Sequence, residues 1–374
     1  MKILFVAPSN SVHTIRWLDR ASKSGIQVHL YDQILGGSEK PSGYPAYFLQ
    51  KRRVFQVFPV FTLIAHFFKL KKILKANNYD LVHGHWLFDI AMLALSFQKA
   101  IKLIITPWGS DIQYSPKKSK FRFVKIVLNK FIVKRLARKA IAVCCDSVAQ
   151  SEILVSYGTE EDKIKIIYFG TDVDRFNPGN RSMELRSKYG AGKDQVLVIS
   201  NRSHEEIYDL STFLGAANAA LKVNTNLRFV LAGSGSLTDS LRKQITELRM
   251  LEYFYIPGRM DDAEFASSTA SCDIYVSTSK SDGGLAASTA EAMASGLPVL
   301  ITDFGENKSW LRQESAGFVF DIGDSRKLAE LILELSFDTN LRNELGKNGR
   351  KIVTKDNNSV HEWNKVLEMY KYLN

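Results

Sequence analysis

Residues 279–299 read SKSDGGLAASTAEAMASGLPV, the pattern of a strand end, a glycine turn, a helix and the next strand. The two adjacent glycines allow a ligand to approach the backbone closely. The helix start that follows offers unpaired N–H groups and the positive end of a helix dipole, which predicts a phosphate site. Glu291, inside the helix, carries a carboxylate that can accept hydrogen bonds from a ribose diol. The alternative interpretation makes Ser288 and Thr289 capping residues and Glu291 a solvated helix acid.

The same alternation of short apolar runs and helical patterns extends over the whole chain. Strands are expected at Lys2–Ala7, Gln27–Tyr31, Asp80–His83, Lys102–Thr106, Ala140–Val143, Lys165–Ile167, Gln195–Ser200, Leu227–Ala232, Tyr253–Ile256, Ile274–Ser277, Pro298–Ile301 and Gly317–Phe320. Strands that alternate with amphipathic helices form parallel sheets covered on both faces. We therefore predict an α/β protein with two Rossmann-like, doubly wound domains that face a central cleft. Ligands of such sheets lie beyond the carboxyl ends of the strands.

Composition supports a folded, two-domain protein. The chain has 374 residues, of which 45% are hydrophobic, and this excludes wholesale disorder. No apolar run approaches the ~20 residues of a membrane-spanning helix, and the N-terminal run Ile3–Ala7 is too short for a secretory signal. The three cysteines, Cys144, Cys145 and Cys272, cannot form a disulfide framework. We expect a soluble protein of a reducing compartment.

Charge is unevenly distributed along the chain, whose formal net charge is +11. Residues 1–178 hold 27 Lys and Arg against 13 Asp and Glu, whereas the remainder holds 23 against 26. Basic residues are interleaved with aromatic and aliphatic ones at 51–75 and 117–139. Such stretches fit core helices with a solvated Lys/Arg face, an anionic membrane surface or a nucleic acid. Taken together they favour the membrane surface, and no recognition motif for a nucleic acid accompanies the charge.

Several motifs agree in order and spacing with one protein family. Residues 291–299, EAMASGLPV, resemble the second half of the donor-site signature of the family-4 retaining glycosyltransferases, which have the two-domain GT-B fold. Other landmarks of that family are matched along nearly the whole chain by Thr106–Asp111, Gly170–Pro178, Ser200–Arg202, Leu231–Gly235 and Gly317–Val319. The resemblance implies transfer of a sugar from a nucleotide-diphosphate donor to an acceptor hydroxyl with retention of anomeric configuration.

The resemblance also assigns roles to the two domains. Residues 1–178 are expected to bind the acceptor and residues 179–357 the nucleotide sugar. The C-terminal helix, 358–374, is expected to pack back on the first domain. The segment Gly170–Asn180 contains Gly, Pro and few apolar residues, as expected of a linker.

Candidate site residues follow from the same resemblance. Arg202 occupies the position of the phosphate-binding arginine, and we assign it to catalysis together with Asp282 and His13. The donor is expected to contact the start of the helix and the carboxylate within it, at Gly284, Leu285, Ala286, Ala287, Ser288 and Glu291. On the acceptor side we expect Trp108, Gly109 and Asp111.

The chain departs from the family pattern at three places. The first glutamate of the signature is replaced by Gly283, and Asp282 just before it is the residue that could take over its role. The run 203–208 lacks the lysine that normally follows the arginine, and Trp108 replaces a histidine before glycine. These departures leave open an altered donor, an altered acceptor or diminished turnover. The rival interpretations are a GT-B scaffold that binds a nucleotide sugar without turnover and a nucleotide-sugar epimerase.

Metal and partner assignments complete the sequence-based predictions. His83 and His85 are spaced like metal ligands, but no third ligand is evident, so packing at a strand end is the favoured interpretation. We assign no metal and no cofactor apart from the nucleotide-diphosphate sugar as co-substrate. The basic first domain favours a lipid-linked or cell-surface glycan acceptor and a peripheral location on the cytoplasmic face of the membrane, with no nucleic acid partner.

Overall fold

The computed structural model describes residues 1–36, 43–109, 111–112, 122–282 and 284–374. The chain forms two compact units, which are Met1–Tyr168 with Trp363–Asn374 (unit 1) and Phe169–Glu362 (unit 2). The sequence-based boundaries were set at 178/179 and 357/358, whereas the contacts divide the chain at 168/169 and 362/363. Gly283 and residues 117–121 of the second basic stretch lie outside the described residues.

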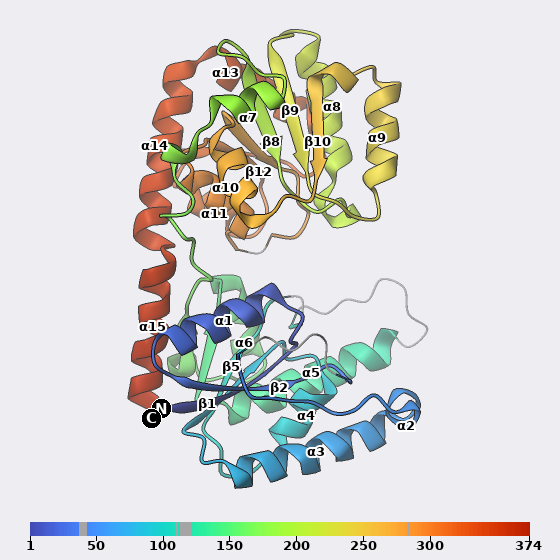
Figure 1. Cartoon of the computed structure of the whole chain (residues 1–374), viewed down its shortest axis with the longest axis vertical. Helices are drawn as coiled ribbons and strands as arrows, with labels where there is room; N and C mark the ends of the chain where they lie inside the picture. The colour runs from blue at the N-terminus through green and yellow to red at the C-terminus, as the bar shows by residue number, and fades with distance from the viewer. Residues whose placement is uncertain (37–42, 110, 113–121, 283) are drawn as a thin grey trace. The chain divides into compact units, whose positions relative to one another are not determined.

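Unit 1 contains a parallel sheet with the strand order β3-β2-β1-β4-β5-β6-β7; Figure 1 labels β1, β2 and β5 of this sheet. Its strands are β1 (Lys2–Ala7), β2 (Gln27–Asp32), β3 (Ala46–Tyr47), β4 (Leu81–His85), β5 (Leu103–Thr106), β6 (Ala142–Cys145) and β7 (Ile164–Ile166). Every residue of β4, β5 and β6 is buried, as expected of strands covered on both faces.

Helices cover both faces of this sheet. One apolar cluster packs α1 (Val12–Lys23) and most of α15 (Ser359–Leu373) against one face, through side chains that include Trp17, Trp363 and Tyr370. A second cluster packs α3 (Pro59–Ala76), α4 (Ile90–Ser96) and α5 (Arg122–Lys139) against the other. The remaining helices are α2 (Arg53–Val57), α6 (Val148–Ser156) and the short turn η1 (Glu161–Lys163).

Unit 2 contains a parallel sheet with the strand order β10-β9-β8-β11-β12-β13. Its strands are β8 (Val196–Ser200), β9 (Leu227–Ala232), β10 (Phe254–Gly258), β11 (Ile274–Ser277), β12 (Val299–Thr302) and β13 (Gly317–Phe320). Its helices are α7 (Met183–Lys188), α8 (Leu210–Leu221), α9 (Thr238–Glu247), α10 (Asp262–Ala270), α11 (Ala287–Ala294), α12 (Asn307–Trp310), α13 (Ser325–Phe337) and α14 (Thr339–Asp356), with the short turns η2 (Pro178–Asn180), η3 (Glu206–Tyr208) and η4 (Leu251–Tyr253). Side chains of α8, α9 and α13 form the core on one face, and α11 lies on the other face, where its Ser288 bonds to Tyr275 of β11.

The predicted fold class is confirmed, because both sheets are parallel, doubly wound and interleaved with helices. In each sheet the chain first adds strands on one side of its first strand and then on the other. β1 is therefore flanked by β2 and β4, and β8 is flanked by β9 and β11. Crevices at such reversal points, beyond the carboxyl ends of the strands, are where ligands of this architecture bind. Within the described residues, every helix is too short or too polar to cross a bilayer.

Candidate functional site

The reversal point of the unit 2 sheet brings Arg202 to the turn before α11. β8 ends at Ser200, two residues before Arg202, while β11 ends at Ser277 and leads through residues 278–286 into α11. Because β8 and β11 are hydrogen-bonded neighbours running in the same direction, both carboxyl ends lie at one edge of the sheet. Residues 80 positions apart in the chain can therefore meet there.

Arg202 contacts the turn and the helix start together. Its Nη2 donates to Oδ1 of Asp282 at 2.6 Å, and its Nη1 donates to Oγ of Ser288 at 2.7 Å. The side chain is 8% exposed, and its Cζ lies 4.4 Å from the centre of the Tyr208 ring. Burial works to lower the pKa of Arg202, but the charge of Asp282 and the neighbouring tyrosines raise it overall. The guanidinium is thus a permanent cation in a fixed orientation.

Helix α11 begins without a side-chain cap. Ala286 is the N-cap residue, with extended backbone, and its methyl side chain cannot cap the first N–H groups of the helix. The Ser288 hydroxyl accepts hydrogen bonds from Arg202 and from the Tyr275 hydroxyl, the latter at 2.9 Å. Since the first N–H groups of a helix have no partner within it, the helix start combines backbone donors with an adjacent cation.

The other predicted donor-side residues lie on the same segment. Gly284, Leu285 and Ala286 are half-buried, and Ala287 is exposed. Glu291 is half-buried and follows Ser288 by three residues, so both lie on the same side of α11. The structure therefore brings Arg202, Asp282 and Ser288 into direct contact and places Glu291 about one helical turn away.

Several buried polar atoms at this edge have no hydrogen-bond partner among the described residues. They are Oγ of Ser200 and of Ser277 and both polar atoms of the Asn201 side chain. An unsatisfied buried polar group costs about 1–3 kcal/mol, so such atoms gather where a ligand or ordered water supplies the partner. None of these atoms was predicted to belong to the site, although serines at the ends of two neighbouring strands were an available signal.

The loop after β9 supports the segment that carries Arg202. A Cβ on Gly233 would lie 2.5 Å from the carbonyl oxygen of Arg202, so only glycine allows this approach. The Glu205 carboxylate accepts hydrogen bonds from the N–H and the hydroxyl of Ser236, at 2.8 and 2.5 Å. These contacts fix the backbone of the loop that carries Arg202.

The reversal point of the unit 1 sheet gathers aromatic and imidazole rings. His13, the second residue of α1, donates its backbone N–H to Oγ of the N-cap residue Ser11 at 3.2 Å. The His13 ring lies 5.4 Å from that of Trp108, which lies 6.2 Å from His85 and 5.8 Å from Trp86. Burial, followed by the charge of Arg16, lowers the pKa of His13, so its imidazole is neutral at pH 7. His13, which was assigned to catalysis, is thus brought together with Trp108, which was expected on the acceptor side. Sequence reasoning missed the contribution of His85 and Trp86.

This edge of unit 1 also contains buried polar atoms without a partner among the described residues. They are Nε1 of Trp108, both ring nitrogens of His85, Oγ1 of Thr14 and Oε1 of Gln33. Burial, followed by the effect of the neighbouring His13, lowers the pKa of His85 to about 3, so His85 is a neutral hydrogen-bonding group. Neutral donors and acceptors of this kind suit the hydroxyl groups of a sugar or polyol.

Asp111 and Gly109 shape the loop that carries Trp108. Asp111 has no exposed surface, and its two carboxylate oxygens accept hydrogen bonds from the N–H groups of Trp108 and Leu87, at 2.8 and 2.7 Å. Burial raises the pKa of Asp111 to about 6, against the effect of these hydrogen bonds. Gly109 has φ +93°, and a Cβ there would lie 3.2 Å from Nε2 of Gln150. Asp111 therefore positions the backbone of Trp108, and the expected place of both residues on the acceptor side stays a prediction.

The histidine pair of β4 is part of the packed interior. His83 uses both ring nitrogens, one with the Tyr370 hydroxyl at 2.6 Å and one with the Thr106 hydroxyl at 2.7 Å. The rings of His83 and His85 lie 4.3 Å apart, and Trp17 packs edge-on against both. Within the described part of the chain, no three His, Cys, Asp or Glu side chains are grouped as metal ligands would be.

Two family models match the chain, one for each half. Residues 182–352 match the model described as Glycosyl transferases group 1. Residues 2–147 match the model described as Glycosyl transferase 4-like.

Curated relatives are distant in sequence. The chain is 25% identical to the alpha-monoglucosyldiacylglycerol synthase of Streptococcus pneumoniae over 246 residues, which are 63% of this chain and 54% of the synthase. It is 22% identical to the UDP-Gal:alpha-D-GlcNAc-diphosphoundecaprenol alpha-1,3-galactosyltransferase of Escherichia coli over 312 residues, 80% of this chain and 77% of that enzyme. The chain thus spans about half the length of the first relative and about three quarters of the second.

Among solved structures, Anabaena Alr3699/HepE in complex with UDP superposes with a TM-score of 0.78 at 20% identity, covering 100% of both chains. At this identity the similarity establishes the fold. The fold, the spacing of the motifs and the two family models agree with one another.

Proposed function

Because the chain belongs to the family-4 type of glycosyltransferases with the GT-B fold, we propose that it transfers a sugar from a nucleotide-diphosphate donor to an acceptor hydroxyl with retention of anomeric configuration. The bond between the anomeric carbon and the phosphate oxygen breaks, and a bond from that carbon to the acceptor oxygen forms. The leaving diphosphate takes the acceptor proton. We assign no covalent nucleophile, no metal and no further cofactor.

The observation that carries this proposal is the contact of the buried Arg202 guanidinium with the turn and first residues of α11. A diphosphate carries anionic oxygens of the kind that a fixed guanidinium and a helix N-terminus bind together. Negative charge increases on the leaving diphosphate in the transition state, so donors already aimed at it lower the barrier. In this proposal Glu291 binds the ribose, and the unpartnered atoms of Ser200, Asn201 and Ser277 contact the rest of the donor.

Asp282 has two roles in the proposed site. Its carboxylate pairs with Arg202 at 2.6 Å and so fixes the guanidinium, and it competes with the donor diphosphate for the same nitrogen. We assign it the place of the family's first signature glutamate, which falls on Gly283 in this chain.

We place the acceptor at the ring cluster of unit 1. His13, Trp108 and His85 offer neutral hydrogen-bonding groups and flat apolar faces, which is what a sugar or polyol needs. The names of two relatives contain diacylglycerol and diphosphoundecaprenol, and residues 1–178 are strongly basic. These observations support an acceptor linked to a lipid or to a cell-surface glycan precursor.

A lipid-linked acceptor requires the protein to work at a membrane surface. We propose a peripheral location on the cytoplasmic face, where anionic lipids attract basic segments by about 1 kcal/mol per Lys or Arg. A UDP-sugar is the first donor to test, since UDP is named both for the E. coli relative and for the Anabaena structure.

The test is a transfer assay with the full chain, a panel of UDP- and GDP-sugars, and a lipid extract or lipid-linked saccharide as acceptor. Release of the nucleoside diphosphate together with a glycosylated lipid supports the proposal, and NMR of the new linkage reports its anomeric configuration. Donor binding in calorimetry without any sugar release would instead favour a binding protein. Conversion of the donor sugar without an acceptor would favour an epimerase, and an inverted anomer would refute retention.

A further inference from the structure

One face of unit 1 exposes an unusual number of large apolar side chains. They are Val60, Phe61, Ile64 and Phe68 on α3, Phe97 after α4, and Phe123, Val124, Val127, Leu128 and Phe131 on α5. Phe123 is 79% exposed and Phe68 is 61% exposed. The opposite side of α3 already fills the core with Leu70 and Ile73, so the exposed residues are surplus to the packing of the unit. Exposed apolar patches of this kind indicate an interaction surface.

The three helices that carry this surface lie side by side, because α4 contacts both α3 and α5 (Figure 1). We call the surface defined by the apolar residues above the docking face. It carries cations as well, among them Lys71 and Lys75 on α3 and Lys125 and Lys130 on α5. Within the described residues, none of these four lysines forms an ion pair with a carboxylate, so their charge is available to a partner.

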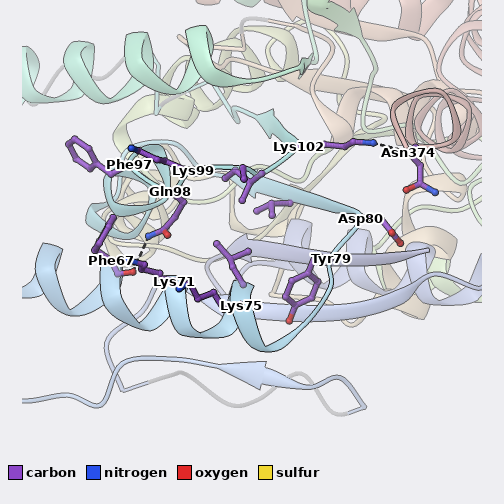
Figure 2. A pocket seen from close by; sticks show the side chains of 14 residues that line it. Phe67, Lys71, Lys75, Tyr79, Asp80, Phe97, Gln98, Lys99, Lys102 and Asn374 are labelled. Atoms are coloured by element: carbon purple, nitrogen blue, oxygen red, sulfur yellow. Dashed lines mark hydrogen bonds between the residues drawn. The ribbon is translucent and has the colours of Figure 1, made fainter.

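A cavity of about 760 Å³ opens at the C-terminal end of α3, at the amino ends of β4 and β5 (Figure 2). Its apolar wall includes Phe67, Leu74 and Ile101. Its cations come from two elements, Lys71 and Lys75 from α3, and Lys99 and Lys102 from the connection between α4 and β5. The candidate acceptor residues lie at the carboxyl ends of the same strands, so this cavity is a separate site.

The charge of the cavity is almost entirely positive. Asp80 is its one acidic lining side chain among the described residues, and its Oδ2 accepts the backbone N–H of Lys2 at 2.6 Å. Lys102 bonds to the carbonyl oxygens of Leu373 and Asn374 at 3.0 and 2.6 Å. Lys71, Lys75 and Lys99 have no carboxylate partner among the described residues. Three lysines with flexible stems beside an apolar wall are suited to a phosphate that is attached to an apolar group.

A second basic hollow, of about 470 Å³, continues along α5. It is lined by Ser96, Phe131, Lys134, Arg135, Arg138 and Lys139. Phe97 lines the first cavity, and the Arg135 guanidinium lies 4.1 Å from the centre of its ring, so Phe97 stands between the two hollows. The docking face therefore alternates cationic hollows with exposed aromatic rings.

We propose that the docking face binds an anionic bilayer, with the lysine-lined cavity receiving the phosphate of a lipid and the exposed residues of α3 and α5 entering the headgroup region. Charge complementarity identifies this occupant. A second copy of the chain would oppose cations with cations, and a nucleic acid backbone would leave the exposed aliphatic side chains without an apolar partner. Basic residues combined with Phe and Leu on helices are the pattern of interfacial membrane binding.

The choice of a bilayer as the partner rests on the membrane location proposed above, while the assignment of the cavity depends on its own geometry. The test is flotation of the full chain with phosphatidylcholine vesicles containing 30% phosphatidylglycerol, and with phosphatidylcholine alone, at 0.1 M salt. We expect binding to the first vesicles only. Donor hydrolysis without vesicles is measured in parallel, so failure of the transferase proposal is seen independently.

Two matched pairs of variants locate the contact. Lys71→Gln/Lys75→Gln/Lys99→Gln removes three charges from the cavity, whereas Lys23→Gln/Lys163→Gln/Lys165→Gln removes three from other parts of unit 1. At about 1 kcal/mol per basic residue, the cavity variant should bind anionic vesicles roughly 100-fold more weakly, and the control should bind nearly as well as the unmodified chain. Phe123→Ser should also weaken binding, and Phe337→Ser, at a phenylalanine of unit 2 that is 67% exposed, should not.

Each alternative result has a definite meaning. If the unmodified chain does not bind anionic vesicles, the membrane location is wrong. If it binds but the cavity variant behaves like its control, the cavity is not a lipid phosphate site. If the unmodified chain does not bind the vesicles, but millimolar glycerol 3-phosphate raises its melting temperature and has no such effect on the cavity variant, the cavity takes a soluble phosphate, and the bilayer is the wrong partner. Circular dichroism and unchanged donor hydrolysis verify that the variants are folded.

Discussion

The two reversal points occupy equivalent places in two similar sheets, yet their chemistry differs. At the end of β8 the central group is a buried guanidinium paired with a carboxylate, Arg202 with Asp282. At the end of β4 the central groups are rings, among which His13 and His85 have pKa values lowered by burial and are neutral. One fold therefore supports a charged site in unit 2 and an uncharged polar site in unit 1.

The difference reflects what each site is proposed to bind. A diphosphate carries a net charge that a fixed cation can stabilise throughout the reaction. An acceptor hydroxyl is neutral, and a buried charge beside it would have to be desolvated without compensation. If this interpretation is right, changes at the end of β8 should alter turnover, and changes at the end of β4 should alter acceptor binding alone.

The largest effect is expected from Arg202→Ala. This change removes a donor aimed at the leaving diphosphate, and loss of one such contact typically lowers kcat by ~10²–10³-fold. Initial rates of nucleoside diphosphate release, with donor and acceptor both saturating, measure it. Arg326→Ala, at an arginine that is 92% exposed, is the matched control and should leave the rate unchanged. If the rate of Arg202→Ala were within threefold of that of the unmodified chain, the site at the end of β8 would not be where the leaving diphosphate is stabilised.

Asp282→Asn separates the two roles of Asp282, which are to fix the Arg202 guanidinium and to compete with the donor diphosphate for it. The amide still accepts a hydrogen bond from Arg202, but it no longer neutralises the guanidinium. We expect kcat to fall about 10–100-fold because the guanidinium loses the charged partner that fixes its orientation, a contact worth about 1.5–3 kcal/mol. KM for the donor stays equal or falls because the diphosphate meets less competition. A raised donor KM with unchanged kcat would instead make Asp282 a purely structural partner of Arg202.

The sequence predicted the fold well because hydrophobic periodicity is a local signal. Every expected strand is present within two residues, and Leu227–Ala232, Ile274–Ser277 and Gly317–Phe320 match at both ends. Among the strands of the described residues, β3 was not predicted, because its two residues, Ala46–Tyr47, are too few to produce a pattern.

The site was predicted less completely because its contacts are not local. The motif around residue 291 located α11 and the spacing indicated Arg202, but the ion pair of Arg202 with Asp282 depends on the pairing of β8 with β11. Tyr275 was missed, although the period of two along β11 places it on the opposite face from Ile274 and Val276 and thus toward α11. Asp111 was placed on the acceptor side by the family resemblance, and the two backbone N–H groups that hold its buried carboxylate could not be seen in the sequence.

A smaller effect concerns the neutral rings of unit 1. Burial holds the pKa of His85 at about 3, below the ordinary 6.5. As pH falls below 6.5 the unfolded chain takes up a proton that the folded chain cannot, so the stability that this histidine confers is present above pH 6.5 and lost on acidification, by about 1.4 kcal/mol per pH unit. In His85→Phe, the free energy of unfolding should fall less steeply between pH 6.5 and 5, by about 1.4 kcal/mol per pH unit. Phe is a suitable replacement because neither ring nitrogen of His85 has a hydrogen-bond partner among the described residues.

Urea unfolding followed by tryptophan fluorescence measures this effect in unit 1, because Trp17, Trp86, Trp108 and Trp363 all belong to that unit and Trp310 alone belongs to unit 2. An acid slope that is the same with and without His85 would mean that the ring is protonated in the folded chain. The uncharged character of the unit 1 site would then be wrong.

The smallest effect is expected from Trp108→Phe, which keeps an aromatic side chain, smaller than the indole, and removes the buried N–H at Nε1. A single neutral hydrogen bond contributes about 0.5–1.5 kcal/mol, so KM for the acceptor should rise about two- to tenfold, while donor hydrolysis in the absence of an acceptor stays unchanged. The matched control is Trp363→Phe, which removes an indole N–H that donates to Oγ of Ser24 at 2.8 Å in the core of the same unit. That change should lower the melting temperature without altering acceptor KM. If Trp108→Phe changed donor hydrolysis instead, the end of β4 would contribute to the reaction of the donor. The division between a charged site and an uncharged site would then fail at Trp108, one of the positions where this chain departs from the family pattern.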